Sequence, residues 1–202
     1  MLSPFAEPAF GRCLLTRNKR LTLVSLLIVF LGSAASAAPQ GRAGVWLEVP
    51  FVKQTEDGCG SASISMLLQY WGAHGADVAP ARADVAEIQQ KLYSRKARGI
   101  FASDMERYLS ESGFRVFAVA GVWNDLQHHL SDGRPLIISL QPAGRRAPLH
   151  YVVVTGIDWE HESVFLNDPA RGKLVRVERA QFEREWHLAG NWMLLAVPMP
   201  KV

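Results

Sequence analysis

The sequence contains only two cysteines, Cys13 and Cys59, among its 202 residues. Cys13 lies in an N-terminal segment that we expect to be removed on export, which leaves one cysteine and excludes an intramolecular disulfide framework. An unpaired thiol in an exported protein indicates a reactive group or an intermolecular bridge, and a buried, inert cysteine is the alternative. Cys59 is therefore a candidate for chemistry.

Several other signatures are also missing. The sequence has no internal repeat, no low-complexity linker that would mark a domain boundary and, beyond residue 37, no apolar run long enough to cross a bilayer. It has no Gly-x-Ser-x-Gly elbow, so a serine hydrolase is not supported, and no glycine-rich phosphate loop. The six histidines show neither the spacing nor the cysteine grouping of a zinc site. We therefore predict no metal and no cofactor.

The charge is close to balanced once the N-terminus is set apart. Lys and Arg total 22 against 19 Asp and Glu, for a net charge of +3. Four of these cations and one acid lie within the first 37 residues, so the remainder is neutral. This distribution gives no reason to expect a nucleic acid partner. The full sequence is 49% apolar, which is enough for one globular domain with its own core or for a tight pair of subdomains.

The first 37 residues have the pattern of a secretory signal peptide. A cationic cluster precedes the uncharged run Leu21–Leu31, and small residues follow up to a cleavage site expected after Ala37. An uncleaved membrane anchor is the alternative, but this run of eleven uncharged residues spans only ~16 Å as a helix, against a hydrocarbon core of ~30 Å. The pattern predicts a periplasmic or secreted protein without a stable membrane span after cleavage.

Hydrophobic periodicity and turn residues predict helices first and an antiparallel sheet second, which is an α+β organisation. We expect a helical lobe over about residues 53–132 and a sheet lobe over about 133–199. Predicted helices cover 59–72, 80–92, 103–113 (opened by a Ser103–Glu106 capping box), 123–130 and 179–186. Predicted strands cover 46–52 (a strand or an extended arm), 114–119, 136–140, 151–157, 163–166, 174–177 and 192–197.

Cys59 lies where the first helix is expected to begin, between Gly58 and Gly60. A thiolate is favoured there because the exposed amides and the helix dipole stabilise negative charge. The glycines let the backbone bend tightly and let a substrate approach. Gln54, slightly earlier, could direct an amide donor at a developing oxyanion, although taken alone it is more readily interpreted as an ordinary solvated side chain.

A second polar group follows about ninety residues later. His150 opens the most apolar predicted strand and is either a satisfied core histidine or a general base. Asp168 ends the next strand, before Pro169. If the two strands form a hairpin and a bulge absorbs their difference in length, both side chains emerge at the same end. The carboxylate would then orient the imidazole and stabilise its protonated form; otherwise Asp168 is a plain turn residue.

In this order the residues resemble the bacteriocin-processing, double-glycine-leader peptidases, a family of papain-like cysteine peptidases. The resemblance runs from about Val49 to Pro198. It is carried by Gln54, by Cys59-Gly60-Ser61-Ala62 with Met66 following, by His150–Gly156 and by Asn167–Gly172.

The resemblance implies a papain-like fold of two lobes and a role for each of four residues. Cys59 would attack the peptide carbonyl, and His150 would be its base. Asp168 would orient His150, and Gln54 would line the oxyanion hole.

The resemblance further implies an exported cysteine peptidase that acts on a peptide or protein, with a glycine-rich leader or an export-system precursor as candidate substrates. The best-known members, however, are cytosolic domains fused to an export transporter, whereas this chain is expected to be exported itself. They also usually have an acidic residue where this chain has Gly58. A cell-wall peptide amidase or acyltransferase on the same triad remains an alternative, as does a non-catalytic peptide-binding domain.

Overall fold

The computed structural model describes residues 44–142 and 148–200. The predicted signal peptide, residues 1–37 with Cys13, lies outside them. The described helices are α1 Cys59–Ala73, α2 Pro80–Ala83, α3 Val85–Leu92, α4 Ala102–Glu111, α5 Trp123–Ser131 and α6 Arg179–Leu188. The described strands are β1 Gly44–Trp46, β2 Phe114–Ala120, β3 Leu136–Leu140, β4 His150–Asp158, β5 Ser163–Asp168, β6 Gly172–Glu178 and β7 Trp192–Pro198.

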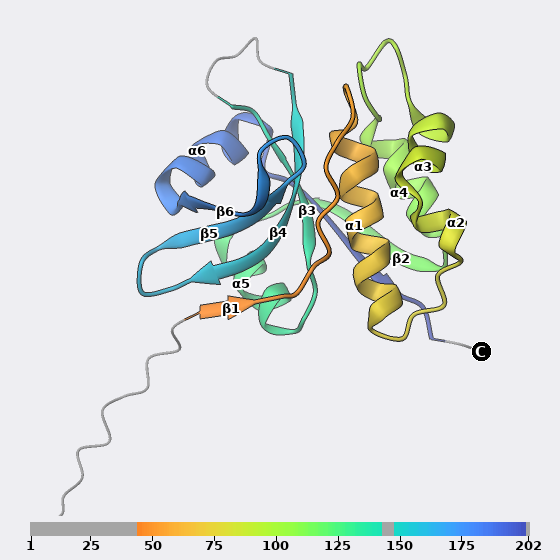
Figure 1. Ribbon diagram of the computed structural model, residues 1–202. Coiled ribbons are helices and arrows are strands. Elements are labelled where there is room, and N and C mark those ends of the chain that lie inside the picture. Colours follow the sequence, from red (N-terminus) through yellow and green to blue (C-terminus); the bar gives the residue numbers. More distant parts are fainter. Residues whose placement is uncertain (1–43, 143–147, 201–202) are drawn as a thin grey trace, which may run out of the picture. The chain divides into compact units, whose positions relative to one another are not determined.

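The described strands form one antiparallel sheet of seven strands, in the order β2-β7-β3-β4-β5-β6. The short β1 pairs with the far end of β4, opposite residues 156–158. Of the segment 46–52, predicted as a strand or an extended arm, only Trp46 belongs to a strand. From there an irregular arm leads to α1 (Figure 1). β2 pairs with β7 along its whole length, so the sheet takes one strand from the segment expected to be helical.

Helices cover both faces of this sheet (Figure 1). Ile137, Tyr151 and Val153 pack in one core cluster with α1, α3 and α4, whereas Ile138 and Val152 belong to a second cluster with α5 and α6. Side chains alternate between the faces of a strand, so a strand covered on both sides must be apolar at successive positions. This explains the successive apolar residues at 136–138 in β3 and 151–154 in β4. The antiparallel sheet with its helices confirms the α+β class.

Helix α1 is buried along most of its length, which sets the position of Cys59 at its first residue. The early helix positions carry small residues, and Ser61, Ser63 and Ser65 are fully buried. The Ser61 hydroxyl donates to the carbonyl of Gly58 at 2.9 Å, and that of Ser65 donates to the carbonyl of Ala83 at 2.6 Å. Small side chains of this kind let neighbouring backbone approach the helix closely.

The helix predicted over 80–92 is two helices, because Asp84 interrupts it. Asp84 has an extended backbone, and its carboxylate accepts a hydrogen bond from the Glu87 amide at 2.9 Å, as an N-cap residue does. An aspartate can compete with the helix for backbone groups in this way, and periodicity alone does not reveal it.

The capping box predicted at Ser103–Glu106 is wrong. Helix α4 begins at Ala102, and its N-cap residue is Phe101, which makes no side-chain capping bond. Ser103 therefore lies inside the first turn, where its hydroxyl cannot act as the cap.

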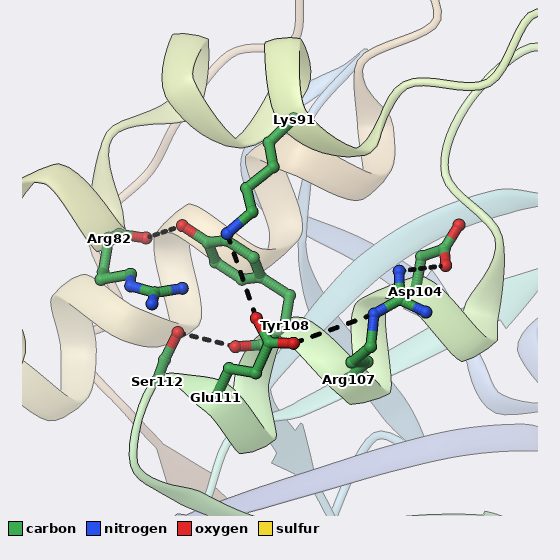
Figure 2. Close-up of polar contacts among 7 residues, drawn as sticks. All are labelled: Arg82, Lys91, Asp104, Arg107, Tyr108, Glu111 and Ser112. Carbon is green, nitrogen blue, oxygen red and sulfur yellow. Dashed lines mark hydrogen bonds and ion pairs between the residues drawn. The ribbon is translucent and has the colours of Figure 1, made fainter.

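Contacts through Tyr108 hold α4 against α2 and α3 (Figure 2). The Tyr108 hydroxyl donates to the carbonyl of Arg82 at 3.0 Å, and the Arg82 guanidinium and the Lys91 ammonium each lie 5.3 Å from the centre of its ring. At the end of α4, the Ser112 hydroxyl donates to the carbonyl of Tyr108 at 2.7 Å. Arg107 pairs with Asp104 at 2.7 Å, an exposed contact of small energetic weight.

Asp84→Ala should lower the free energy of unfolding by about 1 kcal/mol, because the first amides of α3 lose their side-chain acceptor. Urea denaturation with constant m value measures this loss. Ser103→Ala is the matched control and should leave stability within about 0.5 kcal/mol of the wild type. A loss of stability in Ser103→Ala but not in Asp84→Ala would support the predicted capping box and contradict the observed start of α4.

Candidate active site

The four residues singled out in the sequence line one cavity of about 640 Å³, although they come from three separate parts of the chain. Cys59 begins α1, His150 begins β4, Asp168 ends β5, and Gln54 lies in the arm before α1. Apolar side chains form much of the remaining wall: Leu140, Pro142, Pro148, Leu149, Leu166 and Val177. A second cavity of about 840 Å³, lined by Trp123 and Trp186, contains none of the four.

His150 lies between Asp168 and Cys59. Its Nε2 atom is 2.8 Å from Oδ1 of Asp168. The Cys59 side chain lies near enough to the imidazole to help raise the pKa of His150. Because Nε2 binds the carboxylate, Nδ1 is the nitrogen left for the thiol. The side chains of His150 and Asp168 are only 19% and 5% exposed, so water competes little for this pair.

A bulge in the β4–β5 hairpin brings His150 and Asp168 to the same face of the sheet. Near the turn, Gly156 pairs with Phe165, but beyond an extra residue, Thr155, Val154 pairs with Leu166. Continuing this register sets Asp168 opposite Val152, which shares a face with His150. Without the extra residue Asp168 would lie opposite Val153, on the other face, because a shift of one residue reverses side-chain direction.

Electrostatics favour the protonated form of His150. Burial by itself lowers the pKa of His150, but the hydrogen bonds to Asp168 and Cys59 and their negative charges outweigh it and raise the pKa to about 9. Burial likewise tends to raise the pKa of Asp168, whereas its bonds from His150 and from the amides of Ala170 and Arg171 hold the pKa below the usual value. The pair is thus an imidazolium and a carboxylate at neutral pH.

The backbone around Cys59 is closely packed. Gly58 is the N-cap residue of α1, and its amide donates to the carbonyl of Thr55 at 3.1 Å in a tight turn. A Cβ atom at Gly60 would meet the Cβ atom of Ile100 at 3.1 Å, closer than ordinary van der Waals contact. The thiol is partly exposed at the helix N-terminus, where free amides and the helix dipole favour negative charge.

Gln54 is fixed through its backbone, because its amide donates to the carbonyl of Pro169 at 3.0 Å. Its side-chain Oε1 atom is buried and has no hydrogen-bond partner within the described residues. An amide group held in this cavity with spare hydrogen-bonding capacity is suited to a polar substrate group, although the geometry by itself assigns no role.

The structure also adds neighbours that the sequence did not indicate. Asp57 accepts a hydrogen bond from the Tyr93 hydroxyl at 3.3 Å and pairs with Arg98 at 3.7 Å. Burial, with the charges of Cys59 and Glu106, raises the pKa of Tyr151 to about 12. Glu185 on α6 also lines the cavity. No local pattern marks Glu185, since it reaches the cavity through tertiary packing.

The fold is that of the papain-like cysteine peptidases, an antiparallel sheet with a helix that begins at the cysteine. The Peptidase C39 like family model matches residues 46–193, and the chain belongs to that family. This confirms the resemblance drawn from Gln54, Cys59 and the His150 and Asp168 segments. No curated protein sequence matches this chain.

Alignments of this chain with solved structures of similar fold cover nearly the whole of each of those structures. A Bacillus anthracis protein described as a C39-like peptidase aligns with a TM-score of 0.62 at 21% identity, over 78% of this chain and 99% of the other. A double-glycine-motif protease from an AMS/PCAT transporter, solved with its leader peptide, aligns with a TM-score of 0.56 at 21% identity, over 80% and 97%. The peptidase domain of Streptococcus ComA, a bifunctional ABC transporter, aligns with a TM-score of 0.56 at 19% identity, over 74% and 98%.

Among residues 44–142 and 148–200, no helix has the length and apolar character needed to span a bilayer.

Asp168→Asn should lower the pKa of His150 from about 9 by about 1 to 3, because the imidazolium loses a buried negative charge. NMR titration of the ring protons measures this. The ring signals of His161, which pairs with Asp158 at 2.8 Å in the exposed β4–β5 turn, provide the internal control because this ring lies outside the cavity. An unchanged titration of His150 would mean that the carboxylate does not hold the imidazolium.

Proposed function

We propose that this protein is a cysteine peptidase that hydrolyses peptide bonds with Cys59 as nucleophile, His150 as acid and base, Asp168 as the group that orients His150, and Gln54 as an oxyanion donor. The observation that carries the proposal is the largely buried Asp168–His150 hydrogen bond in the cavity that the Cys59 thiol also lines. Membership of the C39-like family supports the same reaction class.

In the first half of the reaction, the thiolate of Cys59 adds to the peptide carbonyl carbon. The oxyanion that forms accepts a hydrogen bond from the Gln54 amide. The imidazolium of His150 then gives its proton to the leaving nitrogen, the carbon–nitrogen bond breaks, and an acyl-enzyme thioester remains.

In the second half, neutral His150 removes a proton from water as the water oxygen attacks the thioester. The carbon–sulfur bond breaks, the carboxylic acid leaves, and the thiolate is restored beside the imidazolium. Asp168 keeps Nδ1 directed at the sulfur throughout and stabilises the imidazolium, which is the role a triad carboxylate has.

The substrate that we propose is an extended peptide, with a glycine-rich leader as the first sequence to test. The leader peptide bound to the double-glycine-motif protease supports a peptide substrate. We further propose that the protein acts in the periplasm or outside the cell, on the strength of the signal peptide predicted over residues 1–37. An export-system precursor would meet the enzyme in that location.

Cys59→Ala should lower turnover by about four orders of magnitude or more and leave the fold intact, because the nucleophile is lost while α1 keeps its packing. Mass spectrometry of glycine-glycine peptides incubated with each protein measures turnover, and circular dichroism checks the fold. Purified peptidoglycan is the parallel substrate: fragments released from it alone would favour the amidase alternative. Hydrolysis by Cys59→Ala at the wild-type rate would refute the mechanism.

The value of kcat/KM should fall as pH rises through about 9, because His150 then loses the proton that the leaving amine requires. Because the pKa of His150 is raised to about 9, the ring is fully protonated well below this pH and loses its proton above it. In Asp168→Asn the alkaline limb should move to lower pH, and the maximal rate should fall by about two to four orders of magnitude. If Asp168→Asn leaves the alkaline limb at the same pH, that limb reports the titration of a group other than His150.

A further inference from the structure

Asn167 is fully buried and makes two hydrogen bonds through its carboxamide, although nothing in the proposed chemistry uses it. Its Nδ2 atom donates to the carbonyl of Val49 at 3.0 Å, and its Oδ1 atom accepts from the amide of Leu174 at 3.1 Å. The first partner lies in the arm that leads to Cys59, and the second lies in β6. One side chain thus joins three segments, next to Asp168.

The bond to Leu174 belongs to a second irregularity of the sheet. Leu166 pairs with Val175 and Asp168 with Gly172, so Asn167 alone lies opposite two residues of β6. Leu174 has a φ of 53°, in the left-handed region that a leucine rarely adopts. The bulge removes the Leu174 amide from the backbone ladder, and the carboxamide of Asn167 supplies the missing acceptor.

The bond to Val49 belongs to a series that fastens the arm to the β4–β5 hairpin. Before it, the amide of Leu47 donates to the carbonyl of Thr155, the bulged residue of β4, at 2.7 Å. After it, the amide of Gln54 donates to the carbonyl of Pro169 at 3.0 Å. The residues on either side of Asp168 therefore both hold the segment from which Cys59 follows.

We propose that Asn167 is a positioning residue, whose carboxamide fixes the arm so that the thiol of Cys59 meets the His150–Asp168 pair. The inference rests on the proposed function. Of these three hydrogen bonds, that of Asn167 alone comes from a side chain, so it is the one that substitution can remove. The ion pair of Lys173 with Glu48 in the arm, at 3.7 Å, is exposed and of small energetic weight. Both of its partner groups are backbone atoms. Val49 is almost completely buried, so water cannot readily replace the lost bond to its carbonyl.

Asn167→Thr and Asn167→Ala test the role through the Cys59 thiol itself, without need of a substrate. Thr preserves most of the volume but cannot reach both partners, and Ala removes both bonds. The rate of Cys59 alkylation by iodoacetamide, measured from pH 5 to 10, reports how much thiolate the imidazolium stabilises. We expect each variant to react about tenfold more slowly at pH 6 and to gain reactivity only at higher pH.

The matched control is Ile88→Val, a small truncation of a fully buried side chain on α3. It should cost comparable stability and leave the alkylation profile unchanged, so general loosening would not imitate the expected effect. With a cleavable peptide, the Asn167 variants should lose about tenfold or more in kcat, while KM stays within about twofold. Variants that fold and keep the wild-type alkylation profile would overturn the inference.

Failure of the proposed function would look different. A wild-type Cys59 that reacts no faster at pH 6 than a free thiol would refute the peptidase mechanism, whatever the Asn167 variants do. If neither Asn167 variant folds, hydrogen exchange of the wild-type protein decides: the Gln54 and Leu174 amides should exchange slowly. Exchange as fast as that of an exposed loop would show that the arm is not held and would overturn the inference.

Discussion

The arrangement of the site depends on one hydrogen bond between two strands, from His150 to Asp168. It joins the first residue of β4 to the last residue of β5, and it can form only because the hairpin between them carries an extra residue at Thr155. Strand geometry alternates side chains between faces, so a regular hairpin would separate these two groups across the sheet. A backbone irregularity within the apolar core therefore decides the electrostatics of the polar site.

The thiol of Cys59 belongs to a segment that precedes this hairpin in the chain. Cys59 begins a helix that is buried on nearly every side, and the arm before it is hydrogen-bonded to the same hairpin. The arm thus fastens the helix to the hairpin through hydrogen bonds, in addition to the packing of their side chains. Rigid elements are the supports that hold reacting groups within the narrow tolerances that catalysis requires. The buried position of Asn167 between them is consistent with that need.

Much of the fold was open to prediction because its signals are local. The small residues after Cys59 and the stop at Gly72 predict α1 to within one residue of its observed end. The apolar run before Gln141 likewise predicts β3. The break at Asp84 and the missing cap at Ser103 were not predicted correctly, because a side chain that accepts from one amide and not another leaves no trace in periodicity.

By itself, the sequence determined the α+β class, the family and the residue types able to perform thiol chemistry. These follow from hydrophobic periodicity and from a characteristic order of glutamine, cysteine, histidine and aspartate. Only the tertiary structure decided the location of the bulge, the raised pKa of His150 and the three-way contact of Asn167. Each depends on contacts between atoms that are far apart in the sequence and are shielded from water, and short-range sequence patterns do not reveal such contacts.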